Sequence, residues 1–280
     1  MKIAICIPVY GMTHAKFTQS LANMIVHSLG ADLRDPAGAP VRLRLETFMV
    51  GSSMLTESRH RLAAEALAWE ADHMLCLDAD HIFPPDTLVR LLAHNLPVVG
   101  CNYPRRFSPT APTAAALPTD GEKEGGLLYT TEEKARAGEV EACAHLGFGV
   151  LLIEMRVFDA LQARAEADAV RDGLPADGAN FLPLFLFEPT ADKVGMVGED
   201  VFFFRKLAAA GIRPYCDHRL SWEIGHCHEA ILTNRVALSQ REAWDRHWRR
   251  VRAKFAGKAR EIEARAQAKA DAKAEGRDDG

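Results

Sequence analysis

The sequence predicts an α/β fold, a mixed sheet flanked by helices, followed by a C-terminal helical tail. Short apolar runs such as residues 2–9 and 73–77 have the length and composition of buried strands. Segments such as residues 14–29 and 52–71 carry apolar residues at helical spacing instead. This alternation is typical of α/β proteins. With 280 residues, 48% of them hydrophobic, the chain can bury one substantial core.

The alternating pattern covers residues 1–236, which we expect to form one domain. Residues 237–280 are rich in Arg, Lys, Glu and Ala, and we expect a charged helical tail that is partly disordered at its end. The first half of the tail is expected to dock on the domain through apolar residues at helical spacing, namely Trp244, Trp248, Val251 and Phe255.

Charge, cysteine content and the length of the apolar runs exclude several classes of protein. A net charge of -4 and a pI of about 6.3 give no electrostatic footprint for nucleic acid. The six cysteines do not form a disulfide framework in a chain of this length, and Cys6 and Cys76 fit buried thiols of a reducing compartment. The first apolar run, about seven residues, is too short for the core of a signal peptide. We therefore expect a cytoplasmic protein without a membrane span.

The first half of the chain predicts a βαβ unit. A strand over residues 2–9 is rich in β-branched side chains and contains a proline near its end. A helix over residues 14–29 follows, then a second strand over residues 42–50 and a long helix over residues 52–71. These elements lead into the strand over residues 73–77.

The second half alternates irregular and regular stretches. Residues 107–137 lack a lasting period and predict a long loop. Residues 139–161 predict a strand, a tight turn, a buried strand and a helix. Residues 172–198 are irregular again. Glu199 and Asp200 then precede an amphipathic helix that ends at Gly211, and a further strand follows.

Two acids directly follow the strand over residues 73–77. Asp78 and Asp80 are separated by Ala79 alone. Because ligands of open α/β sheets bind outside the carboxyl ends of the strands, both carboxylates are expected at the ligand-binding edge. A turn there can bring both onto one hard divalent cation that also carries phosphate oxygens. The alternative is an ordinary solvated turn.

An apolar strand, Asp78-Ala79-Asp80, an apolar residue, a pair of prolines and an amphipathic helix follow one another in this order. This order resembles the metal-binding segment of nucleotide-sugar glycosyltransferases of the GT-A type, family 2-like. The resemblance extends over roughly residues 1–230. It implies a Rossmann-like GT-A sheet, donor contacts from Asp78, Ala79 and Asp80, and a Mn²⁺ or Mg²⁺ ion bound by the two aspartates.

The same resemblance implies that Pro8, Val9 and Tyr10 line the nucleotide pocket. Tyr10 can pack on a base or, alternatively, in the core. Arg59 lies near the edge of the sheet where a diphosphate would sit, and related enzymes carry Arg-Asn where this chain has Arg59-His60. Arg59 is expected to contact the donor, with a solvated helix charge as the alternative.

Two later segments resemble the acceptor side of the family. Gly147 and Phe148 begin a glycine-containing turn that lets the backbone approach the acceptor, and a tight turn between core strands is the alternative. Glu199 and Asp200 resemble the family's Glu-Asp motif. The resemblance implies that Glu199 lies on the acceptor side and that Asp200 is the catalytic base. The alternative for Asp200 is a helix N-cap.

GT-A enzymes often supply a metal-binding histidine after this region. His226 matches the family's Gly-His pattern, and His228 is the reserve. A hydrogen-bonded buried histidine is the alternative for either one. A zinc site built from Cys216, His218, His226 and Cys227 is a further alternative, although the spacing matches no common zinc pattern.

The resemblance as a whole implies a metal-dependent, hexosyltransferase-like enzyme. It would move a sugar from a UDP- or GDP-sugar to a hydroxyl of a glycan, a protein or a nucleobase-linked group, with inversion. One alternative is a non-catalytic nucleotide-sugar-binding protein of the same fold. Another is a sugar-nucleotide nucleotidyltransferase, but that class holds a triphosphate in a Gly-rich loop after the first strand, and residues 8–17 lack one.

Overall fold

A mixed sheet of eight strands forms the centre of the structure, a computed structural model that describes residues 1–35, 37–119, 125–172, 183–190, 195–227 and 231–275. In spatial order the strands are β4 (Arg44–Gly51), β1 (Lys2–Val9), β5 (His73–Leu77), β10 (Val150–Glu154), β7 (Val98–Gly100), β13 (Tyr215–Asp217), β9 (Val140–His145) and β8 (Ala115–Ala116). Strands β4, β1 and β5 pair in parallel, and β10 runs antiparallel between β5 and β7.

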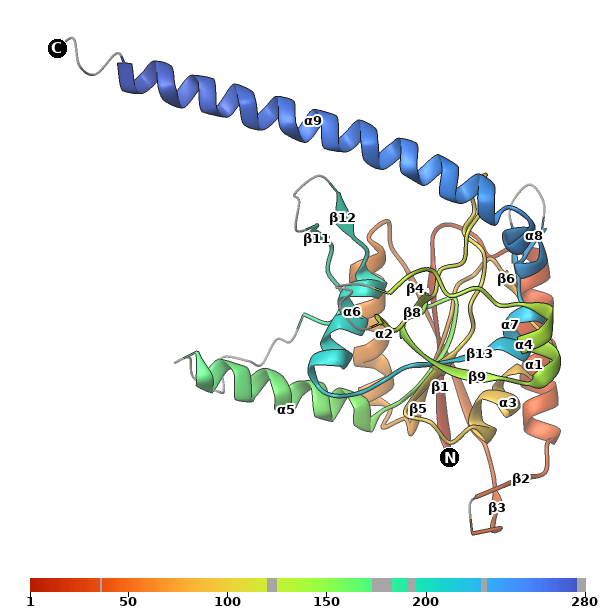
Figure 1. Cartoon of the computed structure of the whole chain (residues 1–280). Helices are drawn as coiled ribbons and strands as arrows, with labels where there is room; N and C mark the ends of the chain where they lie inside the picture. The colour runs from red at the N-terminus through yellow and green to blue at the C-terminus, as the bar shows by residue number, and fades with distance from the viewer. Residues whose placement is uncertain (36, 120–124, 173–182, 191–194, 228–230, 276–280) are drawn as a thin grey trace.

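Helices cover both faces of this sheet (Figure 1). One face carries α2 (Leu55–Ala68), α5 (Arg156–Arg171) and α6 (Glu199–Ala209). The other carries α1 (Ala15–Gly30), α3 (Thr87–Ala93), α4 (Glu132–Ala137) and α7 (His218–Glu223). The predicted α/β class, with a mixed sheet between helices, is confirmed.

The side chains of β1 alternate between two cores, as expected for a central strand. Ala4 and Cys6 belong to the core under α2 and α6, whereas Ile3, Ile5 and Ile7 belong to the core under α1 and α3. All five are buried. Because both faces of β1 are apolar, a one-residue shift in pairing would exchange the small and the large side chains between the two cores.

A cluster of phenylalanines fills the core beneath α2 and α6. The ring of Phe148 lies 5.1 Å from that of Phe203 and 5.3 Å from that of Phe185, and Phe203 stacks on Phe185 at 5.3 Å. All three are buried. The cluster therefore supports the beginning of α6 and the turn that contains Phe148.

A small second sheet joins distant parts of the chain at the carboxyl end of β5. It consists of β6 (His81–Ile82), β14 (Gly225–Cys227) and β15 (Ile231–Thr233). The antiparallel pairing of β6 with β14 sets His226 directly opposite His81.

The described parts of the segment over residues 107–137, namely 107–119 and 125–137, are more ordered than the expected loop. They contain β8, α4 and several buried side chains, including Thr110, Ala114 and Leu128. Asn102, itself buried, holds this segment by donating to the carbonyl of Leu128 at 2.7 Å and accepting from the amide of Ala114 at 3.2 Å. Thr110 and Ala114 are polar or small, and Leu128 alone does not create an apolar period in the sequence.

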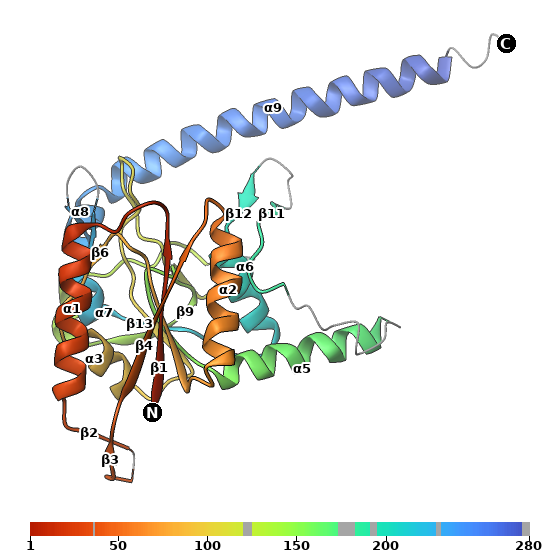
Figure 2. The same cartoon turned by 180° about the vertical axis from the view of Figure 1, so that it is seen from behind.

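The remaining elements lie at the periphery. They are β2 (Leu33–Arg34), β3 (Pro40–Val41), β11 (Glu188–Pro189), β12 (Met196–Val197), α8 (Asn234–Ser239) and α9 (Arg241–Glu275). Helix α9 starts beside the domain and projects away from it (Figures 1 and 2). Its Trp244 is buried against Phe107, with ring centroids 5.4 Å apart, whereas Trp248 and Phe255 are exposed. No described helix is both long and apolar enough to cross a membrane.

Replacing Phe203 by alanine should lower the free energy of unfolding by about 3–5 kcal/mol, because a fully buried ring leaves a cavity among its neighbours. Phe255→Ala is the control, since this side chain is exposed, and its effect should stay within about 0.5 kcal/mol. Denaturant unfolding measures both. Equal effects of the two substitutions would contradict the assigned core.

Candidate functional site

The Asp78–Asp80 segment leaves the carboxyl end of β5 and meets two other parts of the chain. The amide of Asp78 donates to the carbonyl of Gly149 at 3.1 Å, which ties the segment to the start of β10. The carbonyl of Ala79 accepts from the amide of His14 at 3.1 Å, which ties it to the loop after β1. The segment is therefore fixed at the edge of the sheet where ligands of α/β proteins bind.

A buried arginine links this segment to α6. Arg59, on α2, is 4% exposed, and its Nη2 lies 3.2 Å from Asp78 Oδ1 while its Nε lies 3.2 Å from Glu199 Oε1. Its guanidinium also lies over the ring of Phe148, 4.7 Å from the centroid. Burial disfavours the charge, but Asp78 and Glu199 outweigh burial and raise the pKa of Arg59. The two predicted motifs are thus held together by one cation.

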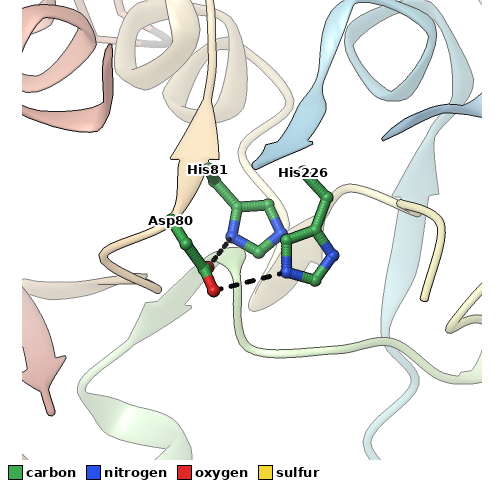
Figure 3. A group of neighbouring side chains, drawn as sticks. All are labelled: Asp80, His81 and His226. Carbon is green, nitrogen blue, oxygen red and sulfur yellow. Dashed lines mark ion pairs between the residues drawn. The ribbon is translucent and has the colours of Figure 1, made fainter. Parts of the chain in front are cut away.

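Asp80, His81 and His226 form a compact group (Figure 3). Each offers one ligand atom, and these atoms lie within 4.8 Å of one another. Asp80 Oδ1 is 3.1 Å from His81 Nδ1, and Asp80 Oδ2 is 3.5 Å from His226 Nε2. The two imidazole rings are stacked with centroids 4.3 Å apart. A carboxylate with two imidazole nitrogens is a donor set that transition metals accept.

The hydrogen bonding of this group fits a cation. His226 Nδ1 lies 2.8 Å from the carbonyl oxygen of Pro104, and because a carbonyl only accepts, Nδ1 carries the hydrogen. In the neutral ring, Nε2 then directs a lone pair at Asp80. The 3.1 Å contact between Asp80 Oδ1 and His81 Nδ1 lacks hydrogen-bond geometry. Asp80 Oδ1 and both nitrogens of buried His81 therefore have no hydrogen-bond partner among the described residues. A cation between these atoms would satisfy them.

The ionisation of the group also suits metal binding. Burial would raise the pKa of Asp80, but the imidazoles of His226 and His81, when protonated, outweigh burial and hold that pKa well below its usual range, so Asp80 is a carboxylate at neutral pH. Burial lowers the pKa of His81 in spite of the neighbouring carboxylate. Metal ligands must be unprotonated, and a carboxylate beside a neutral imidazole meets that requirement at neutral pH.

The structure distributes the predicted metal ligands differently from the sequence. Asp80 and His226 lie together, but Asp78 is outside the compact group, and His81 takes the third place. The Asp78 carboxylate uses Oδ1 for Arg59, so its assignment as a metal ligand stays a prediction. The sequence did not single out His81; its position directly after Asp80, opposite a histidine on β14, is visible only once β6 and β14 pair. His228 lies outside the described residues.

Asp200 lies in the first turn of α6. The N-cap of this helix is Gly198, so the N-cap alternative for Asp200 does not hold. Asp200 Oδ1 accepts from the amide of Val201 at 2.7 Å, and a Cβ added at Gly198 would lie 2.7 Å from the same oxygen. Burial raises the pKa of Asp200, although Val201, Arg59 and Arg105 act in the opposite direction. A carboxyl with a raised pKa is a suitable proton acceptor near neutral pH.

The turn at Gly147 and Gly149 packs closely against the site. A Cβ on Gly147 would lie 2.0 Å from the hydroxyl of Tyr103, and one on Gly149 would lie 2.5 Å from Cε1 of His81. The Tyr103 hydroxyl accepts from the amide of Gly149 at 2.8 Å. A side chain at either position would therefore displace the buried Tyr103 or His81, and Phe148 between them is buried under Arg59. Contact of Gly147 or Phe148 with an acceptor stays a prediction.

The end of β1 supplies an exposed aromatic residue. Pro8 is buried and Val9 is half-buried, whereas Tyr10 is 84% exposed. Core packing of Tyr10, the alternative weighed above, is therefore wrong. Contact of these three residues with a nucleotide stays a prediction.

The zinc alternative does not match the structure. His226 faces Asp80, whereas His218 belongs to a separate group with Glu139 and Glu141. Both nitrogens of His218 are already engaged, Nδ1 with Thr130 at 2.9 Å and Nε2 with Glu141 at 2.9 Å. A single zinc ion cannot use both histidines in this arrangement.

Comparisons with known proteins give weak similarities. No family model and no curated protein matches this chain. Similar solved structures include A197 from STIV, with 14% identity, 81% of this chain and 86% of that chain covered, and a TM-score of 0.43. They also include a crystal structure of GalNAc-T7 with UDP, GalNAc and Mn²⁺, with 12% identity, 81% of this chain and 44% of that chain covered, and a TM-score of 0.43. The chain thus spans less than half of GalNAc-T7.

Replacing Arg59 by methionine should lower the free energy of unfolding by about 3–5 kcal/mol, because two carboxylates lose their buried partner. The matched control is Arg136→Met, which removes an exposed ion pair with Glu132 and should cost at most about 1 kcal/mol. Urea unfolding with circular dichroism compares the two. An Arg59→Met protein as stable as the control would show that the bridge contributes little.

Proposed function

We propose that this protein is a metal-dependent glycosyltransferase of the GT-A type, transferring a sugar from a nucleotide-diphosphate donor to an acceptor hydroxyl with inversion. The observation that supports it most is the convergence of Asp80, His81 and His226 at the carboxyl end of β5, where Asp80 Oδ1 and both nitrogens of His81 have no hydrogen-bond partner among the described residues. Arg59 bridges Asp78 and Glu199, and these two residues are close in sequence to Asp80 and Asp200 respectively.

A divalent ion would be held by Asp80 and His226, with His81 or Asp78 as a further ligand. The ion would offset the charge of the donor diphosphate and of the leaving nucleoside diphosphate. Imidazole ligands favour Mn²⁺ over Mg²⁺, because Mg²⁺ prefers oxygen. The exposed ring of Tyr10, directly after β1, is available to pack on a nucleobase.

Asp200 would act on the acceptor. As the acceptor oxygen forms its bond to the anomeric carbon and the bond to the diphosphate breaks, the Asp200 carboxylate takes the hydroxyl proton. Attack opposite the leaving group inverts the anomeric centre. Arg59 holds Glu199, the neighbour of Asp200, and so fixes the start of α6 relative to the metal-binding segment.

Binding of UDP or GDP should require a divalent cation, because two aspartates at the strand end repel a diphosphate. Calorimetry with Mn²⁺ should give an affinity at least about tenfold higher than in EDTA, and Asp80→Asn should remove most of that gain. The control is Asp32→Asn, an exposed acid that also pairs with an arginine. Equal nucleotide affinity in EDTA and in Mn²⁺ would refute the metal assignment.

Asp200→Asn keeps the shape of the side chain but removes its basicity, so sugar transfer should slow by about 10²–10⁴ while Mn²⁺-dependent UDP or GDP binding stays unchanged. Because burial raises the pKa of Asp200, wild-type kcat/KM should rise with pH above the usual carboxyl range, as the base loses its proton. The matched control is Asp159→Asn, an exposed acid in the first turn of α5.

This experiment also separates the alternatives. Wild-type protein that binds a nucleotide sugar with Mn²⁺ but never transfers or hydrolyses the sugar would be a binding protein. Release of pyrophosphate from a nucleoside triphosphate would identify a nucleotidyltransferase. Full activity of Asp200→Asn, or a product of retained configuration, would overturn the inverting mechanism alone.

A further inference from the structure

Arg106 occupies the outer side of the Asp80 carboxylate. Its Nη1 lies 2.8 Å from Asp80 Oδ2, the oxygen that also faces His226 Nε2 at 3.5 Å. The Arg106 side chain is 55% exposed, whereas the Asp80 side chain is 26% exposed. An exposed cation thus contacts the candidate metal ligand from the solvent side, whereas His81 and His226 contact it from the buried side.

A metal ion and this guanidinium would compete for one oxygen. The Asp80 oxygen that faces His226 is Oδ2, so an ion held by both residues would contact Oδ2, whether or not Oδ1 also binds it. Oδ2 is the oxygen that Arg106 already uses. At that position the two charges of the ion would repel a guanidinium on the same oxygen. Arg106 must therefore leave Asp80 when a metal binds through Oδ2.

The segment around Arg106 permits this movement. The amide of Arg105 donates to the carbonyl of Ala111 at 2.8 Å, and the hydroxyl of Thr110 donates to the carbonyl of Arg105 at 2.6 Å. These bonds close the chain into a compact turn with exposed Arg106 on it. The side chain can swing by several ångströms through rotamer changes while the turn stays in place.

The neighbouring arginines are less suited to bind an incoming phosphate. Arg59 is buried with Nε and Nη2 committed to carboxylates. The guanidinium of half-buried Arg105 lies over the ring of Trp244, 5.5 Å from the centroid. Arg106 is exposed, and a guanidinium binds phosphate oxygens in the bidentate geometry that it uses for carboxylates.

We propose that Arg106 competes with the divalent cation for Asp80 and, once displaced, binds the donor diphosphate. This inference rests on the proposed function, because it takes the diphosphate to be bound on the same cation. The phosphate oxygens would then lie within a few ångströms of the position that Arg106 leaves. Arg106 would thus bind the Asp80 carboxylate before the metal enters and the donor diphosphate afterwards.

The exchange predicts effects of opposite sign for Arg106→Gln. Without nucleotide, loss of the competing cation should strengthen Mn²⁺ binding about threefold to tenfold. With saturating Mn²⁺, loss of a phosphate contact should weaken UDP or GDP binding about tenfold or more. Calorimetry measures both affinities, and electron paramagnetic resonance of free Mn²⁺ checks the first.

The control is Arg136→Gln, which removes an exposed arginine that also forms a 2.8 Å ion pair, with Glu132, and should change neither affinity. Repeating the Mn²⁺ titration in 1 M salt, where the Debye length is about 3 Å, removes long-range effects of the lost charge. The gain in Mn²⁺ affinity should persist there, because the competition is a direct contact.

The other outcomes overturn the inference. If Arg106→Gln weakens both affinities, Arg106 only supports the shape of the site. If neither affinity changes, Arg106 is a solvated side chain. If wild-type protein binds neither Mn²⁺ nor a nucleoside diphosphate, the proposed function itself fails, and that result is distinguishable from the first two.

Discussion

The site depends on the ion pairs of one buried arginine. Arg59 joins three elements: α2, on which it lies, the segment after β5 through Asp78, and the start of α6 through Glu199. A buried guanidinium is costly unless all its surroundings compensate, and here two carboxylates and the face of Phe148 do so. Asp78, Glu199 and Phe148 offset the cost of burying the guanidinium only if the three elements keep their relative positions. The arginine therefore fixes geometry more than it adds net stability.

This bridge divides the acids of the site into two kinds. Each predicted motif contributes one carboxylate to Arg59, Asp78 from the first and Glu199 from the second. The other acid of each motif has a different environment. Asp80 lies beside the imidazoles of the site, whereas Asp200 lies at the start of α6. Burial and hydrogen bonding then move the pKa values of Asp80 and Asp200 in opposite directions, down for the first and up for the second. Paired acids with separated pKa values are what a metal ligand and a proton acceptor require.

The sequence predicted the parts of the structure that have a period or a fixed order. Apolar alternation located the central strands, and the resemblance placed Asp80 and His226 in one site although they are far apart in the chain. The sequence could not reveal His81, because the two-residue strand β6 is too short to show a pattern. His81 comes to lie opposite His226 only through the pairing of β6 with β14. The sequence also could not reveal that Arg59 bridges Asp78 and Glu199, because a buried ion pair leaves no periodic pattern in a sequence. The regular structure in the described parts of residues 107–137 depends on small side chains and on the hydrogen bonds of Asn102. Secondary-structure propensity does not reflect either of these.

The charges of the described site constrain the order in which ligands arrive. Asp78, Asp80, Glu199 and Asp200 carry up to four negative charges, and the positive charges near them belong to three arginines, Arg59, Arg105 and Arg106. A nucleoside diphosphate adds at least two more negative charges, so its approach to the protein alone is opposed. In the proposed mechanism, a divalent cation would reverse this balance locally and would release Arg106 from Asp80 for the phosphates. The proposed function therefore requires the metal to enter before the donor or together with it, because the reversed charge and the freed Arg106 would both follow from metal binding.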